Sequence, residues 1–234
     1  MNTCKDKTES ESCQTNTNPS LWKGRTIEID DAGTGDLVGD AFVGFRDAKS
    51  GKIIFRSIPV DLYTGENGSS DKLKKHIQKI TMDALKALKH DKEDRILLCR
   101  GSCFDPVREY FKETNIYYEP AIIEGELQDA VEGKLIQHLR NLGITSPKLT
   151  KEAGAKRYYI LFNWVCQDLP NREKFVKSGF PAWKKKWRDI AIKRCEKNQK
   201  NEFQIRDDIE RRAKEICEEM FTKQISTKDC FSNR

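Results

Sequence analysis

The sequence predicts an α/β protein, a mixed five-stranded sheet flanked by helices and followed by a helical C-terminal extension. Three segments near the N-terminus alternate apolar and polar residues and are joined by short turns, which is typical of antiparallel strands. Further along, short apolar runs alternate with segments whose apolar residues recur every three or four positions. This order is expected where helices connect parallel strands.

The three N-terminal strands are expected at 25–31, 37–46 and 53–60. In the first of them, Ile27 and Ile29 alternate with polar residues, and the segment DAKSGK provides a turn before the third. Connections this short favour an antiparallel meander.

The next part of the chain is expected to alternate helices and parallel strands. The segment RILLCRG, at 95–101, is a short apolar run of the kind found where both faces of a strand are covered. A further strand is expected at 115–123. Apolar spacing predicts helices at 71–89, capped by Ser70, at 106–113 and at 124–142.

Beyond residue 144 the sequence predicts a helical extension that packs on the domain. Helices are expected at 157–169, from Pro181 onward and at 202–222. Five apolar residues of the last helix are expected to be buried: Ile205, Ile209, Ala213, Ile216 and Met220. The expected organisation is a disordered tail (1–23), an α/β domain (24–143), a basic extension (144–225) and a frayed terminus (226–234).

The composition argues against an exported or membrane protein. The first 20 residues mix acids with polar residues and lack arginine, unlike a signal or transit sequence, and the longest apolar run, 158–165, is too short for a bilayer. The eight cysteines are therefore expected to be reduced, and their spacing does not fit a structural zinc site. We expect a cytoplasmic protein without a membrane partner.

Positive charge is concentrated in the C-terminal part of the chain. The whole chain has a net charge of +6, whereas residues 144–234 carry 22 basic and 13 acidic residues. Within 176–200, basic residues alternate with aromatic ones, and such residues can neutralise phosphates and stack on unpaired bases. Four side chains are expected to contact nucleic acid: Lys184, Lys185, Lys186 and Arg188. The alternative is a solvated basic face whose tryptophans belong to the core.

Two adjacent carboxylates, Asp30 and Asp31, end the first strand before the sequence AGTG. They suggest a cation site, because two acids exceed what a turn requires; the alternative is a turn in which a carboxylate accepts backbone N–H groups. On the helix expected at 124–142, Glu124, Gln128 and Glu132 are spaced by four beside the apolar stripe. They can face the sheet, or Glu132 can be solvated and Gln128 a structural amide.

Several short motifs occur between about residues 25 and 190: IDDAG (29–33), LLCRG (97–101), EGELQDAVE (124–132), FNWVCQD (162–168) and NREKFVKSGFPAW (171–183). With the order of the elements, they resemble the RNase H-like superfamily, and more closely a group of uncharacterised RNase H-like proteins of archaea and bacteria. The resemblance implies a sheet in which the first and fourth strands are parallel neighbours.

The resemblance also implies metal-dependent cleavage of phosphodiester bonds. One or two Mg²⁺ or Mn²⁺ ions would be held by four acids: Asp30, Asp31, Glu124 and Glu132. Asp30, Asp31 and Glu132 would be catalytic together with Arg100, which would clamp a phosphate, and Gln128 would contact the substrate. The chain departs from the superfamily's nucleases at the end of the fourth strand, where Cys99, Arg100 and Gly101 replace the usual carboxylate.

The expected function is therefore nucleic-acid processing, as a magnesium-dependent endonuclease acting on DNA or RNA. The missing carboxylate favours a rival, a non-catalytic nucleic-acid-binding or scaffold protein with the same fold. An ATPase of the actin-like branch is less favoured, because DAGTG is the only glycine-rich candidate for a phosphate loop. Cys99 lies on an apolar strand without a neighbouring histidine and is expected to be a buried, inert thiol.

Overall fold

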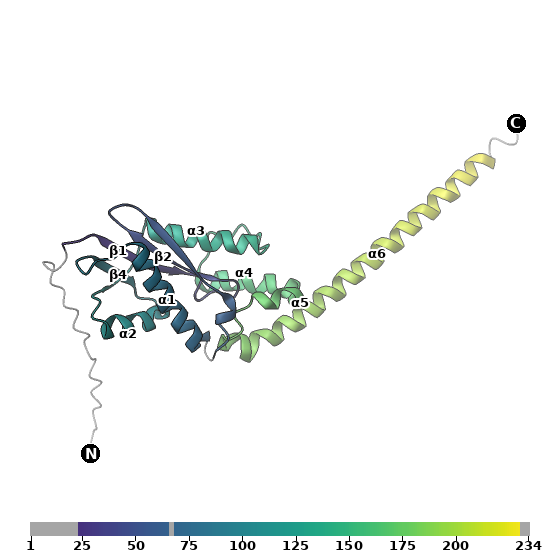
Figure 1. Ribbon diagram of the computed structural model, residues 1–234. Helices are drawn as coiled ribbons and strands as arrows, with labels where there is room; N and C mark the ends of the chain where they lie inside the picture. Colours follow the sequence, from purple (N-terminus) through teal and green to yellow (C-terminus); the bar gives the residue numbers. More distant parts are fainter. Residues whose placement is uncertain (1–22, 66–67, 230–234) are drawn as a thin grey trace, which may run out of the picture.

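The computed structural model describes residues 23–65 and 68–229, with side chains described as far as Ile216. Except for Lys23, the predicted disordered tail lies outside these residues, as does 230–234 of the predicted frayed terminus. The predicted α/β class is confirmed: a five-stranded mixed sheet in the order β3-β2-β1-β4-β5 is flanked by helices, and a long helix follows (Figure 1).

The sheet combines an antiparallel meander with two parallel strands. The meander consists of β1 (Thr26–Ala32), β2 (Ala41–Asp47) and β3 (Ile53–Ile58). On the other side of β1 lie β4 (Arg95–Cys99) and β5 (Glu119–Ala121), both parallel to it. The carboxyl ends of β1 and β4 therefore meet at one edge of the sheet, as expected for parallel neighbours.

Four predicted strands are shorter in the structure: β3 and β4 each end two residues early, and the other two differ more. The strand expected at 37–46 begins only at Ala41, because Gly33 and Gly39 adopt φ values of +81° and +82° and turn the intervening chain into a loop. The strand expected at 115–123 is reduced to β5, which lies at the edge of the sheet and pairs only with β4.

Helices cover both faces of the sheet. The α1 helix (Asp71–Ala87) and the α2 helix (Asp105–Glu113) share one core with Ile27 and Ile29, while α3 (Glu126–Asn141) packs on β1 and β2 from the opposite face. The predicted cap of α1 is confirmed, since the Ser70 side chain accepts a hydrogen bond from the Leu73 amide.

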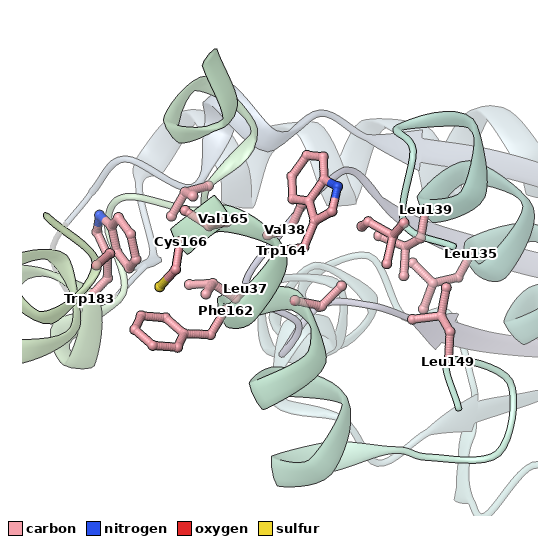
Figure 2. Packing of buried hydrophobic residues seen from close by; sticks show 14 of the residues in the cluster. Leu37, Val38, Leu135, Leu139, Leu149, Phe162, Trp164, Val165, Cys166 and Trp183 are labelled. Atoms are coloured by element: carbon pink, nitrogen blue, oxygen red, sulfur yellow. The ribbon is translucent and has the colours of Figure 1, made fainter. Parts of the chain in front are cut away.

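The C-terminal extension packs on the face that α3 covers. It comprises α4 (Gly154–Gln167), α5 (Leu169–Arg172), a π-helical turn (Trp183–Trp187) and α6 (Arg188–Asp229). Figure 2 shows the common core, in which Leu37 and Val38 of the loop after β1 meet residues of α3, α4 and the π-helical turn. The sheet and the extension therefore share one hydrophobic core.

The prediction for the last helix is wrong in two respects. A single helix runs from Arg188 to Asp229, and Ile205, Ile209, Ala213 and Ile216 are exposed rather than buried. Their spacing was typical of a buried stripe, but this part of α6 projects away from the body (Figure 1). The Met220 side chain lies outside the described residues. Among the helices described, none has the length and apolar character needed to cross a lipid bilayer.

Candidate metal site and adjoining cleft

The predicted acidic site lies where β1 and β4 end side by side. Asp30 and Asp31 are on β1 and Cys99 is the last residue of β4, and one potential ligand atom from each lies within 4.8 Å of the other two. Two carboxylates and a thiol at this spacing could hold a metal ion.

Asp30 is buried on the face of the sheet that α3 covers, with 6% of its surface exposed. Burial raises the pKa of its carboxyl group; a hydrogen bond from the Cys99 thiol opposes this, while the negative charges of Asp31 and Glu132 add to it. Keeping Asp30 ionised at neutral pH therefore costs free energy. A bound cation would remove that cost.

Asp31 is held on the opposite face of the sheet. Its carboxylate accepts one hydrogen bond from the Thr34 hydroxyl at 2.6 Å and another from the Cys103 thiol at 3.2 Å. A Cβ atom added at Gly101 would lie 2.9 Å from Asp31 Oδ1. Thr34 and Cys103 therefore hold this carboxylate, and Gly101 leaves room for it because it has no Cβ.

The two cysteines of the site carry protonated thiols at neutral pH. Burial raises the pKa of Cys99 to about 11, and it raises the pKa of Cys103 as well, where the charge of Asp31 adds to the effect. These directions agree with the expectation that Cys99 is not a nucleophile. The expectation that Cys99 is buried is wrong, because the residue is only half-buried. It lies close to Asp30 and Asp31 and is a possible metal ligand, a role that the sequence analysis missed.

Glu132 lies on α3 and is paired with a buried arginine of the extension. Arg157 Nη1 and Nη2 lie 2.7 and 3.3 Å from the two Glu132 carboxylate oxygens, and Arg157 Nε lies 3.2 Å from Asp36 Oδ2. Burial raises the pKa of Asp36, although the charges of Arg157 and Lys177 oppose this. Glu132 thus acts on Asp30 through its charge while it is bound to Arg157.

A second buried cation, Lys177, lies on the other side of these acids. Its ammonium group is fully buried, donates a hydrogen bond to the Gly33 carbonyl and lies 4.4 Å from the centre of the Tyr63 ring. Burial lowers the pKa of Lys177 to about 8, against the opposing charges of Asp36, Asp40 and Asp31. Arg157 and Lys177 therefore bring positive charge from the extension to the acidic end of the sheet.

Three other predicted site residues lie away from this cluster. Glu124 precedes α3 rather than lying on it, because Gly125 has φ +77° and the helix begins at Glu126, and Glu124 is exposed. Gln128 is exposed on α3 in a second cavity, which also contains Glu132 and Arg157.

Arg100 is exposed at the end of β4. The arginine that binds this strand end is Arg108 of α2, which donates hydrogen bonds to the carbonyl oxygens of Cys99 at 2.6 Å and Gly101 at 3.1 Å. Sequence reasoning missed Arg108, which gave no local signal.

The predicted basic face lies on the π-helical turn and the first residue of α6. Lys184, Lys185, Lys186 and Arg188 are exposed, and Arg188 forms an ion pair with Glu173 at 2.6 Å. Trp183 is buried, and Trp187 packs edge-on against Phe162 with ring centroids 4.9 Å apart. Both tryptophans therefore belong to the core, the alternative considered for them above.

A cleft of about 620 Å³ opens beside Asp31, between the first turns of α1 and α2. Thr34 and Cys103, the two partners of Asp31, both line it. Its other walls combine apolar and polar side chains, among them Tyr63, Leu73, Ile77, Phe180, Ser102 and Lys74. Two carboxylates, Asp105 and Glu109, line it as well. A cleft with this lining can accept a small, partly apolar group.

Asp36, Arg157 and Lys177 were also missed from the sequence. Each stands near other polar or charged residues in the sequence, so no local pattern marked it as buried. A search against protein-family models and a search of curated proteins both find no match to this chain.

Proposed function

We propose that this chain is an RNase H-like, divalent-metal-dependent protein that cleaves phosphodiester bonds in nucleic acid. The observation that carries the proposal is the convergence of Asp30, Asp31 and Cys99 at the carboxyl ends of two parallel neighbours. The strand order β3-β2-β1-β4-β5 supports the RNase H-like assignment, because the resemblance implies that the first and fourth strands are neighbours.

The residues present fit a divalent cation. Asp30 and Asp31 offer hard oxygen ligands, and the buried Asp30 gains most from a nearby positive charge. The Cys99 sulfur is a softer donor, which favours Mn²⁺ over Mg²⁺ if it ligates. When bound, such an ion activates water and stabilises the leaving oxygen of a phosphodiester.

The remaining residues would bind and orient the substrate. The cleft beside Asp31 is large enough for an unpaired nucleotide, with apolar walls for the base, and Lys74, which shares the cleft with Asp105 and Glu109, would contact a phosphate. Arg100 is exposed at the end of β4 and would contact a phosphate there. Lys184, Lys185 and Lys186 would hold the nucleic-acid backbone.

The test is a cleavage assay on labelled single-stranded, duplex, hybrid and branched substrates, with Mg²⁺, Mn²⁺ or chelator. The wild-type chain is expected to cleave at least one substrate only with metal, and Asp30→Asn and Asp31→Asn are expected to abolish cleavage. Asp129→Asn is the matched control, because Asp129 is an exposed acid on α3, and it is expected to leave activity unchanged. Cleavage that persists in both site variants would disprove the proposal.

One observation favours a second function, a non-catalytic nucleic-acid-binding scaffold. Arg157 and Lys177 already place two buried positive charges among the acids, and Arg157 occupies both oxygens of Glu132. A scaffold would bind nucleic acid without metal, with an affinity that falls steeply as salt rises. Wild type and Asp30→Asn would then bind equally well, and neither would cleave.

A further inference from the structure

The projecting part of α6 is exposed on all sides. The helix is 42 residues long, which corresponds to about 63 Å at 1.5 Å per residue. Its first turns pack on α4 through Ala191 and Cys195, and the Asn198 side chain donates a hydrogen bond to the Cys166 carbonyl. From Gln199 to Ile216 every side chain is exposed except that of Asp208, which is half-buried.

An apolar stripe runs along this projecting part. At 100° per residue, Ile205, Ile209, Ala213 and Ile216 fall within an arc of about 80°. Seven large hydrophobic side chains are exposed in the described part of the chain, and these three isoleucines are among them. Isoleucine is not a residue that stabilises an isolated helix, and a row of exposed apolar side chains usually marks an interaction surface.

Charge is distributed unevenly along the same segment. Residues 206–210 contain three acidic residues and one basic residue, whereas 211–215 contain three basic residues and one acidic residue. A second copy in antiparallel orientation would place the acidic half of each helix against the basic half of the other. A parallel copy would instead bring like charges together.

We propose that residues 202–216 of α6 form a dimer interface, in which two copies of this chain pair as an antiparallel coiled coil. The segment is complementary to itself, as a twofold interface requires. Pairing centred between Glu210 and Arg211 sets Ile205 opposite Ile216 of the second copy. Asp208 and Arg212 lie on the same flank of the stripe, so Asp208 faces Arg212 of the second copy. The inference is independent of the metal site.

Sedimentation equilibrium of the full chain at micromolar concentrations tests this interface. The wild type is expected to be a dimer and Ile209→Lys a monomer, because the lysine would place two charges in the apolar seam. Phe203→Gln is the matched control, since Phe203 is even more exposed than Ile209 but lies about 160° around the helix from Ile205. It is expected to leave the dimer intact, and circular dichroism should show that both variants remain folded.

A charge exchange tests the antiparallel orientation. Asp208→Arg is expected to weaken the dimer, and the double variant Asp208→Arg with Arg212→Asp is expected to restore it. Failure of the double variant to recover would disprove the antiparallel arrangement. A monomeric wild type, or a dimer that survives Ile209→Lys, would overturn the whole proposal. A monomer whose α6 binds nucleic acid would be one form of the first outcome.

Discussion

Arg157 donates hydrogen bonds to both carboxylate oxygens of Glu132, at 2.7 and 3.3 Å. Through this pair the C-terminal extension fixes the α3 carboxylate whose charge acts on Asp30. The same guanidinium contacts the buried Asp36 at 3.2 Å. The extension is therefore part of the candidate site, and changes within it should alter both the stability of the chain and its acidic cluster.

Arg157→Met should lower the free energy of unfolding by about 3 kcal/mol or more, because it removes the only cation in direct contact with the buried Asp36 carboxylate among the described residues and leaves only the more distant charge of Lys177. Urea denaturation at neutral pH measures the change. Arg140→Met, at an exposed position on α3, is the control and should have little effect. The double variant Arg157→Met with Asp36→Asn should recover part of the loss; no recovery would mean that Asp36 is not the group left uncompensated.

Lys177 should make the free energy of unfolding depend on pH above about pH 8. Its pKa is lowered to about 8 when folded, so between about pH 8 and 10.5 the unfolded chain binds the proton that the folded chain has lost. The free energy of unfolding should therefore rise with pH in this window, relative to Lys177→Met. Denaturation curves at several pH values measure this difference. Lys184→Met, at an exposed lysine, should run parallel to the wild type.

Gly101→Ala should weaken metal binding without a large loss of stability. The added Cβ would press on Asp31 Oδ1 at 2.9 Å and displace the carboxylate, an effect expected to cost about tenfold or more in Mn²⁺ affinity. Isothermal titration with Mn²⁺ measures it. For Gly133→Ala on α3, no atom lies within 4 Å of the added Cβ. That control should leave affinity unchanged and raise helix stability by about 1 kcal/mol.

Variants of Arg100 and Arg108 should distinguish an effect on the substrate from an effect on the stability of the fold. Arg108→Ala removes a hydrogen bond from the Cys99 carbonyl and one of two from the Gly101 carbonyl, which also accepts from the Phe104 amide, and should reduce the free energy of unfolding by about 1–3 kcal/mol. Arg100→Ala should leave stability within about 0.5 kcal/mol of the wild type, because the residue is exposed. If Arg100 clamps a phosphate, its loss should reduce turnover more than substrate binding; an equal loss of both would contradict that role.

Local sequence patterns predicted the parts of this fold that depend on residues close together in the sequence. The alternation around Ile27 and Ile29 and the apolar run at 95–99 gave β1 and β4, and the resemblance put them side by side. Two parallel strand ends were then enough to place Asp30 and Asp31 at the site. The two-residue repeat of a strand put the two side chains on opposite faces of the sheet, but it did not show which of them points inward.

Partners that are distant in sequence could not be predicted in the same way. Arg157, Lys177 and Cys99 reach the acids through tertiary packing, which leaves no periodic signal. The stripe at Ile205 and Ile209 shows the opposite problem, because helical spacing identifies an apolar face but does not say what covers it. Likewise, the helix was predicted to begin at Glu124, but Gly125 has a positive φ and α3 begins only at Glu126, so Glu124 lies outside the helix.

The loop after β1 is joined to the extension by backbone bonds as well as by side chains. Val38 forms an antiparallel bridge with Val176, the Lys177 amide donates to the Leu37 carbonyl, and the Gly39 amide donates to the Phe175 carbonyl. During synthesis, this loop can therefore form these backbone bonds only after residue 177 has emerged from the ribosome. A chain that stops before Phe175 would therefore keep the side-chain contacts of Leu37 and Val38 with α3 and α4 but lack these backbone partners.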